Sequence, residues 1–177
     1  QGLEFYKDAL YESTGSGDYA KSFIAKVNLK TGKHLQYTVL DEAYFGEGIT
    51  ILNDTIYQIV WQKQKCFVYT LDFKQVNSFD YEGEGWRLTN NGKSIIMSKG
   101  TAEIVWRNPR TCKIEKKIYA FSNENDFQNL NELELIEGKL MANVYTQNYM
   151  IEIDTSNGKV LSKIDCAGIV EKGMVGN

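Results

Sequence analysis

The chain repeats one strand pattern four times, and this internal repeat constrains the fold more than any other feature of the sequence. Each unit has an apolar stretch, a tight turn, a second apolar stretch, a polar loop, and then two alternating strands around another turn. The apolar stretches that open the four units are 2–5, 48–52, 86–88 and 132–136. A unit of four short antiparallel strands in roughly 40 residues is typical of a β-propeller blade. We therefore predict an all-β propeller with about four blades in the 177 residues of this chain.

The turns support this assignment over other β folds. The first turn of each unit is rich in residues that tolerate left-handed backbone angles, and the second turn opens with Asn or Asp in three of the four units. Gly32 and Gly158 stand near the end of two of these later turns, and Cys112 stands near the end of the third. Sandwiches and closed barrels also use short strands, but they do not require one four-strand unit to recur.

Composition fits a single globular domain over residues 1–177 and excludes several classes of protein. The net charge is −3 and no cluster of Lys and Arg is present, which argues against a nucleic-acid partner. The apolar runs are too short to cross a bilayer, so we expect no membrane partner. The three cysteines are far apart and lie beside no histidine, so they predict no metal site, and we interpret them as small buried side chains.

The repeat also predicts which residues face one another. In a four-stranded blade, the loop before the innermost strand and the loop after the second strand lie on the same face of the molecule. Carboxylates, a carboxamide and large aromatic side chains occupy these places, a composition expected of a ligand site. The residues predicted at this common mouth are Glu12, Glu47, Trp61, Glu84, Trp86, Asn131, Glu132 and Tyr145.

Each of these residues, taken alone, also has a purely structural interpretation. Glu47 in Gly-Glu-Gly is compatible with an exposed turn, Trp61 and Trp86 with packing between blades, and Asn131 with a turn cap. Glu12 is compatible with the start of a solvated loop. Their coincidence at one mouth favours a site. His34 lies on a solvent-facing strand position, so a histidine-based triad or metal site is not expected.

Several segments resemble the plant and bacterial glutamine cyclotransferase family. They occur in order along the chain and lie at the expected places in the blades. The similar segments are 1–5, 10–15, 44–50, 56–61, 83–86, 130–134 and 142–144. The resemblance implies a five-bladed propeller, of which this chain would hold about four blades, with the terminal strands of the ring missing at both ends.

The resemblance also implies roles for residues at the mouth. Glu47 would be the acid and base carboxylate, Glu12 a second carboxylate nearby, and Asn131 a hydrogen-bonding group for the substrate. Trp61 and Trp86 would form the walls of the pocket. Tyr145 stands where the family usually has Trp, and Arg87 stands where it usually has Gly. A lysine that lines the site in the family would lie beyond residue 177.

The function implied is that of a glutaminyl-peptide cyclotransferase, an acyltransferase that converts an N-terminal glutamine into pyroglutamate and releases ammonia. We expect Glu47, Glu12 and Asn131 to act in the reaction, and Trp61, Trp86, Tyr145 and Glu132 to bind the substrate. The scheme needs no metal and no cofactor. The expected partner is a peptide or protein with an N-terminal glutamine, and the expected enzyme is monomeric and extracytoplasmic, either periplasmic or secreted.

Two alternatives remain open on the sequence alone. The same mouth suits a propeller that binds a peptide or a carbohydrate without chemistry. A structural array of blades within a larger assembly would instead expose apolar edges.

Overall fold

The computed structural model describes residues 1–15, 21–123 and 126–169, and in these residues it contains sixteen strands and no helix. The strands form four sheets, each of four consecutive antiparallel strands. Blade 1 consists of β1 (Gly2–Tyr6), β2 (Ala9–Thr14), β3 (Phe23–Val27) and β4 (His34–Val39). Blade 2 consists of β5 (Phe45–Leu52), β6 (Thr55–Trp61), β7 (Lys65–Thr70) and β8 (Gln75–Asp80). Blade 3 consists of β9 (Arg87–Asn90), β10 (Ile95–Ser98), β11 (Glu103–Arg107) and β12 (Ile114–Tyr119). Blade 4 consists of β13 (Leu130–Ile136), β14 (Lys139–Val144), β15 (Tyr149–Asp154) and β16 (Val160–Asp165).

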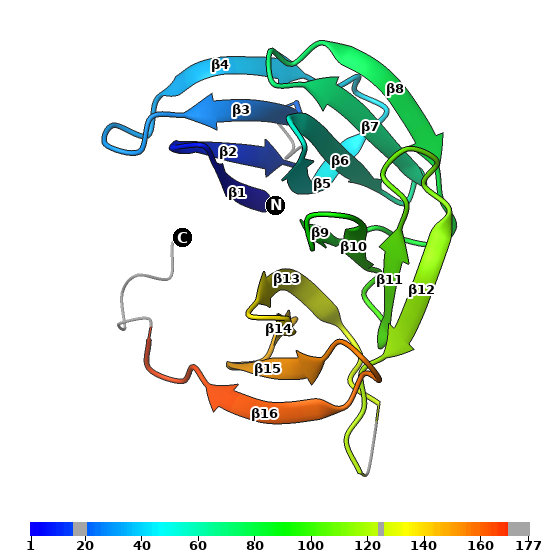
Figure 1. Cartoon of the computed structure of the whole chain (residues 1–177). Helices are drawn as coiled ribbons and strands as arrows, with labels where there is room; N and C mark the ends of the chain where they lie inside the picture. Colours follow the sequence, from blue (N-terminus) through cyan, green and yellow to red (C-terminus); the bar gives the residue numbers. More distant parts are fainter. Residues whose placement is uncertain (16–20, 124–125, 170–177) are drawn as a thin grey trace.

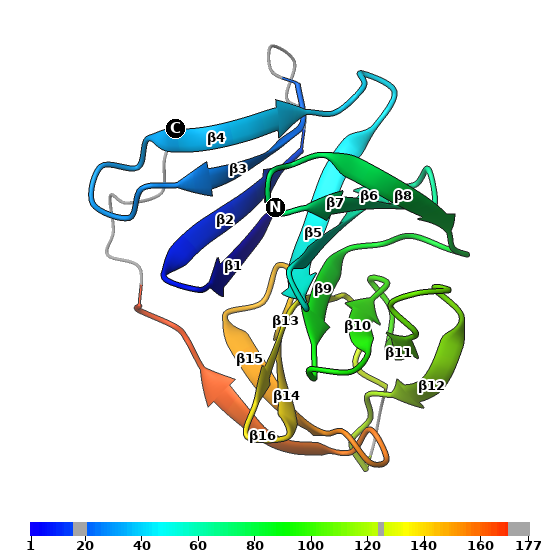
Figure 2. The ribbon, with the colours of Figure 1, turned by 45° about the horizontal axis from the view of Figure 1, so that its top comes forward.

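The four blades follow one another around a common axis, which confirms the predicted propeller (Figure 1). The first strand of each blade lies nearest the axis and the fourth lies at the rim. In the tilted view of Figure 2 the inner strands β1, β5, β9 and β13 again gather at the centre. Within the described residues the ring is open between blade 1 and blade 4 (Figure 1).

Three hydrophobic clusters hold the blades together, one between each pair of neighbours. Ile24 and Ile49 belong to the cluster between blades 1 and 2, and Ile59 and Met97 to the cluster between blades 2 and 3. The cluster between blades 3 and 4 includes Ile104 with Leu133. The middle strands of blades 2 and 3 are buried on both faces, whereas the rim strands β4, β8, β12 and β16 are mostly exposed. The core is therefore divided into layers that run between the sheets, as stacked sheets require.

The predicted turns adopt the backbone angles that their residues suggested. Asn53 and Asp54, between β5 and β6, both have positive φ (51° and 58°), as a tight hairpin turn requires. In the later turn of blade 3, Cys112 takes the left-handed position (φ 57°) that glycine takes in blades 1 and 4. The described residues form no helix that could serve as a membrane span.

Two inner strands come into direct contact through a glycine. A side chain at Gly48 of β5 would lie 2.6 Å from Cα of Arg87 and 2.7 Å from the nitrogen of Leu88, both in β9. The nitrogen of Gly48 also donates a hydrogen bond to the carbonyl oxygen of Trp86 (3.1 Å). Blades 2 and 3 are therefore in contact at the place where Glu47 and Trp86 enter the site.

We predict that Gly48→Ala destabilises the protein by about 1–3 kcal/mol, because the new methyl group would meet backbone atoms that cannot rotate away. Urea unfolding followed by circular dichroism measures the change. Gly92→Ala is the comparison, since that glycine has open space around it and only its positive φ (79°) opposes substitution. A Gly48→Ala variant as stable as the wild-type protein would show that β5 and β9 can separate freely.

Candidate active site

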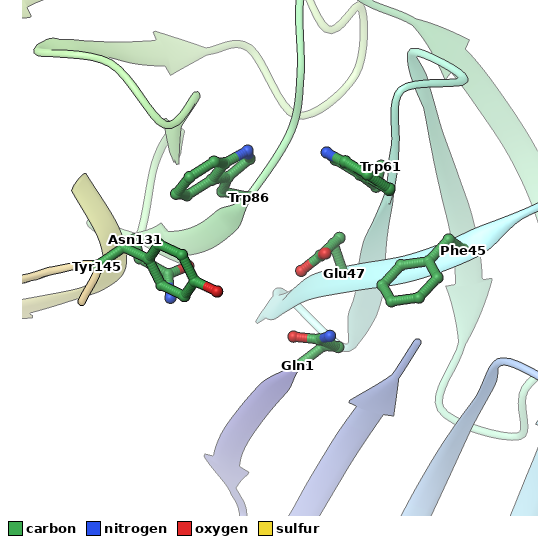
Figure 3. Close-up of a pocket in the computed structure, with 7 residues that line it drawn as sticks. All are labelled: Gln1, Phe45, Glu47, Trp61, Trp86, Asn131 and Tyr145. Atoms are coloured by element: carbon green, nitrogen blue, oxygen red, sulfur yellow. The ribbon is translucent and has the colours of Figure 1, made fainter. Parts of the chain in front are cut away.

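A pocket of about 300 Å³ opens at the axis, where the inner strands of blades 2, 3 and 4 meet. This volume is at the lower end of the range for small-molecule sites, a size suited to a small ligand or one residue of a larger one. Figure 3 shows the Glu47 carboxylate pointing into the space between the surrounding side chains. The residues that line the pocket are Gln1, Phe45, Glu47, Trp61, Trp86, Asn131 and Tyr145.

Two β-bulges aim the polar side chains of the pocket. The pairing of β5 with β6 shifts register between Gly46 and Ile49, and Glu47 lies inside this irregularity. The pairing of β13 with β14 shifts between Leu130 and Leu133, a segment that contains Asn131. A bulge inserts residues that have no partner on the next strand and redirects their side chains. The two inner strands thus turn a carboxylate and a carboxamide toward the same pocket.

The Asn131 carboxamide projects into the pocket because backbone atoms make the local structural bonds. The carbonyl oxygen of Asn131 accepts a hydrogen bond from Ser98 Oγ (2.9 Å). The next nitrogen along the chain, that of Glu132, donates to Asn143 Oδ1 (2.6 Å). These two bonds attach the bulge of β13 to its neighbours and leave the amide group facing the open space (Figure 3).

A single carboxylate oxygen orients the two indole rings of the pocket. Trp61 Nε1 donates to Glu84 Oε2 at 3.1 Å, and Trp86 Nε1 donates to the same oxygen at 2.9 Å. Hydrogen bonds to an ionised acceptor are stronger than neutral ones. Because both N–H groups already have a partner, the rings contribute flat apolar walls rather than donors to the pocket.

Further aromatic contacts fix the outer edges of these walls. The rings of Phe45 and Trp61 meet edge to face with centroids 5.8 Å apart, and those of Trp86 and Tyr145 do the same at 5.8 Å. Edge-to-face packing is the favoured geometry for aromatic pairs. Trp61 and Tyr145 are 38% and 54% exposed, so a ligand can reach these aromatic walls of the pocket from solvent.

The environment of Glu47 raises the pKa of its carboxyl group toward neutral pH. The side chain is only 13% exposed, and burial raises the pKa of Glu47 to about 7, while the positive charge of Arg87 acts in the opposite direction. A carboxyl group with a pKa in this range can both accept and release a proton near pH 7.

Within the described residues, no group of three or more His, Cys, Asp or Glu side chains is arranged to hold a metal ion.

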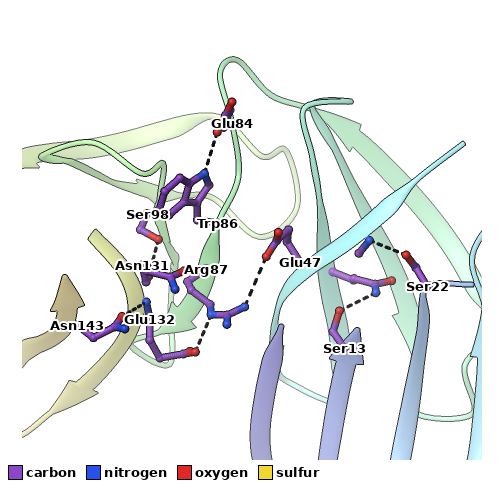
Figure 4. A network of polar contacts seen from close by, with 12 residues as sticks. Ser13, Ser22, Glu47, Glu84, Trp86, Arg87, Ser98, Asn131, Glu132 and Asn143 are labelled. Atoms are coloured by element: carbon purple, nitrogen blue, oxygen red, sulfur yellow. Dashed lines mark hydrogen bonds and ion pairs between the residues drawn. The ribbon is translucent and has the colours of Figure 1, made fainter. Parts of the chain in front are cut away.

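Arg87 connects Glu47 to blade 4. Its Nε donates to Glu132 Oε2 at 2.6 Å, and its Nη1 lies 3.7 Å from Glu47 Oε2 (Figure 4). The Arg87 side chain is 10% exposed, whereas that of Glu132 is 49% exposed. The pocket thus has a buried cation beside its carboxylate and a solvent-facing carboxylate behind that cation.

Of the eight residues that the sequence predicted at the common mouth, five line the pocket, Glu84 bonds to two of these five, and Glu12 and Glu132 lie elsewhere. Glu47, Trp61, Trp86, Asn131 and Tyr145 line the pocket.

The placement predicted for Glu12 is wrong. Successive side chains along a strand point to opposite faces of the sheet. Ser13 points to the face of blade 1 that packs on blade 2, where its Oγ accepts a hydrogen bond from Gln58. Its neighbour Glu12 therefore points to the opposite face of blade 1. There the Glu12 carboxylate contacts Nε2 of His34 at 2.9 Å. His34 itself is on the surface as expected, with a side chain that is 36% exposed.

Glu132 is also not a lining residue of the pocket. It follows Asn131 directly, but its carboxylate turns to Arg87 instead of the pocket.

Sequence reasoning missed Phe45, Gln1 and the role of Glu84. Phe45 is opposite Trp61 in the β5–β6 pairing, and cross-strand pairing would have identified it once the bulge was known. Gln1 lies just before β1 and reaches the pocket beside Glu47 (Figure 3). Glu84 was predicted at the mouth, but nothing in the sequence indicated that it bonds to both indoles.

Comparison with known proteins agrees with the strands and the pocket described above. The family model described as "Glutamine cyclotransferase" matches residues 1–176. The chain belongs to the glutamine cyclotransferase family. It is also 35% identical over 167 residues to a protein named "Glutaminyl-peptide cyclotransferase" from Arabidopsis thaliana. This match covers 93% of the chain but only 52% of the relative, so the chain spans about half the length of that protein.

Solved structures show the same fold. Glutaminyl cyclase from Myxococcus xanthus superposes with a TM-score of 0.83 at 23% identity, covering 98% of this chain and 76% of the other. A protein of unknown function from Bacteroides caccae gives 0.74 at 16% identity, covering 93% and 66%. The WD40 domain of Pan2 from Neurospora crassa gives 0.64 at 11% identity, covering 92% and 51%. At these identities the likeness concerns the propeller architecture.

We predict that Glu47 titrates with a midpoint near pH 7, well above the ordinary value of 4.5 for a glutamate, because burial disfavours its charged form. Carbon-13 NMR of protein labelled in its glutamate carboxyl groups measures the titration, and the signal missing in Glu47→Gln gives the assignment. A midpoint near 4.5 would show that water reaches the carboxylate freely.

We predict that Glu84→Ala disturbs the packing of both indoles, because the two N–H groups lose their shared acceptor. Near-ultraviolet circular dichroism and tryptophan emission should change. Glu82→Ala, at an exposed position two residues earlier, should leave both spectra as in the wild-type protein. Identical spectra for the two variants would mean that aromatic packing alone holds the rings.

Proposed function

We propose that the protein is a glutaminyl-peptide cyclotransferase that converts an N-terminal glutamine into pyroglutamate and releases ammonia. The observation that carries this proposal is the buried Glu47 carboxyl group, which points into a small pocket. Trp61 and Trp86 form the walls of this pocket, and the Asn131 carboxamide also lines it. Membership of the glutamine cyclotransferase family and the name of the Arabidopsis relative support it. The substrate class is a peptide or protein that begins with glutamine.

The reaction needs one group that moves a proton twice. The α-amine of the substrate attacks the δ-carbon of its own side chain, a C–N bond forms, and the bond to the amide nitrogen breaks as ammonia leaves. The amine must lose a proton and the leaving nitrogen must gain one. A free α-amine has a pKa of about 7.7–8.0, so a carboxylate whose conjugate acid has a pKa of about 7 can take that proton at little cost. Glu47 then returns it to the leaving nitrogen.

The other lining residues would orient the substrate and stabilise charge. The Asn131 amide is a candidate donor to the oxygen that becomes negative as the ring closes. The flat faces of Trp61 and Trp86 would hold the methylene groups of the glutamine side chain in a folded shape. Orientation of this kind can supply several kcal/mol in an intramolecular closure, on the order of 7 or more in favourable cases. This scheme needs no metal or cofactor for any step.

We predict that Glu47→Gln lowers the rate of cyclisation by about 10²-fold or more, since the amide can neither take nor return a proton. Ammonia release from a glutaminyl peptide and the matching loss of mass measure the reaction. Glu12→Gln is the matched control, because the Glu12 side chain contacts His34 outside the pocket, and we expect near wild-type turnover.

Two results would count against the proposal. Full turnover by Glu47→Gln would remove Glu47 from the mechanism. A wild-type protein that binds a glutaminyl peptide but releases no ammonia would be a binding propeller without chemistry.

We also propose that the enzyme works outside the cytoplasm, in the periplasm or after secretion, as its family resemblance suggests. Of the three cysteines predicted to be buried, Cys166 is partly exposed, whereas the free thiols of Cys66 and Cys112 are buried and so compatible with such a place. Fractionation of cells that express the full reading frame would test this, and recovery of the protein in the cytoplasm alone would exclude it.

A further inference from the structure

We propose that Arg87 is a positioning residue that shifts the Glu47 carboxyl group toward its ionised form, and that Glu132 limits the strength of this effect. The kinetic part of this inference rests on the function proposed above, whereas the electrostatic part can be measured without any turnover.

The geometry of the Arg87 guanidinium carries the proposal. Arg87 is the first residue of β9, and its side chain crosses from the Glu132 carboxylate of blade 4 to the Glu47 carboxylate of blade 2 (Figure 4). The contact with Glu132 is short, 2.6 Å from Nε, whereas the contact with Glu47 is long, 3.7 Å from Nη1. Nη1 is fully buried, and it has no hydrogen-bond partner among the described residues. The cation is thus bonded to the outer carboxylate and acts on the inner one through its charge.

Three charged side chains act on Glu47 from the elements around it. Arg87 from β9 favours the carboxylate. Glu132 from β13 and Glu84 from the loop before β9 favour the protonated form. Of these groups, only Arg87 forms an ion pair with Glu47. Burial has the largest effect on Glu47, and among the neighbouring charges the Arg87 guanidinium has the strongest influence on its charge state.

This arrangement suits a group that must alternate between base and acid. Without a nearby cation, a buried carboxyl group stays protonated at neutral pH and is a poor base. With a cation in a tight, two-bond contact, the carboxylate would hold its charge and would be a poor proton donor. The long contact between Arg87 and Glu47 gives an electrostatic attraction of intermediate strength. The Glu132 carboxylate keeps this contact long because it holds the guanidinium near blade 4.

Charge-removing variants of the two partners should shift the Glu47 titration in opposite directions. Carbon-13 NMR of glutamate-labelled protein measures the midpoint, with Glu47→Gln as the assignment. We expect Arg87→Gln to raise the midpoint by about one pH unit, as loss of an opposite charge within 4–6 Å does. We expect Glu132→Gln to lower it, because a negative charge is removed and Arg87 becomes free to approach Glu47. Arg110→Gln, which removes an exposed cation from the same blade, should leave it unchanged.

The kinetic counterpart is the acid limb of kcat/KM against pH, which should move in the same order and return toward wild type in Arg87→Lys. If no ammonia is released by any form, the proposed function fails while the NMR order still tests Arg87. Equal midpoints in the wild-type, Arg87→Gln and Glu132→Gln proteins would overturn the inference, as would shifts in the same direction. Lower thermal stability with an unmoved midpoint would assign Arg87 a structural role between blades. Should Arg87→Gln fail to fold, Glu132→Gln alone decides the sign.

Discussion

The close approach of the inner strands at the axis is the constraint on which the rest of this structure depends. The backbones of β5 and β9 come so near one another that at Gly48 there is no space for a side chain against β9. Gly46 is under the same restriction, because a side chain there would lie 2.5 Å from the carbonyl oxygen of Thr14 in blade 1. The residue between these glycines is Glu47. The glycines required for packing thus flank the one carboxylate that the pocket exposes.

The site lies on bulges of two inner strands. A regular strand would alternate its side chains strictly between the two faces of its sheet. The irregular pairings in β5 and β13 break this alternation and turn Glu47 and Asn131 toward one pocket. The aromatic walls need no such device, because Trp61 ends β6 and Trp86 precedes β9. Glu84 then fixes both walls with one oxygen.

The repeat in the sequence was sufficient to predict the fold. The turn residues and the alternating apolar positions recur in the same order in each unit. The strands assigned to one unit therefore predict the strands of the others. The pocket could be predicted less completely from the sequence. The position of a residue in the repeat places it at one end of a blade but does not give the direction of its side chain. Glu12 illustrates this, since one step along β2 separates the face that carries Ser13 from the face that carries Glu12. The bulges are irregularities in the pairing of two strands within a blade, and the ion pair of Arg87 with Glu132 is a contact between blades; the repeat encodes neither.

A raised pKa is not what distinguishes Glu47 from other acids of the axis. Burial and the neighbouring charge of Glu134 also raise the pKa of Glu4 to about 7. Glu4, however, is outside the lining of the pocket, and its carboxylate accepts a hydrogen bond from Thr50 Oγ1 at 3.5 Å. Burial near the axis thus shifts both carboxyl groups, as expected for any acid placed there. Only Glu47 combines that shift with open space, two indole walls, a carboxamide and a cation at 3.7 Å. The chemistry proposed for this protein therefore follows from the surroundings of the carboxyl group, and the pKa is one consequence of them.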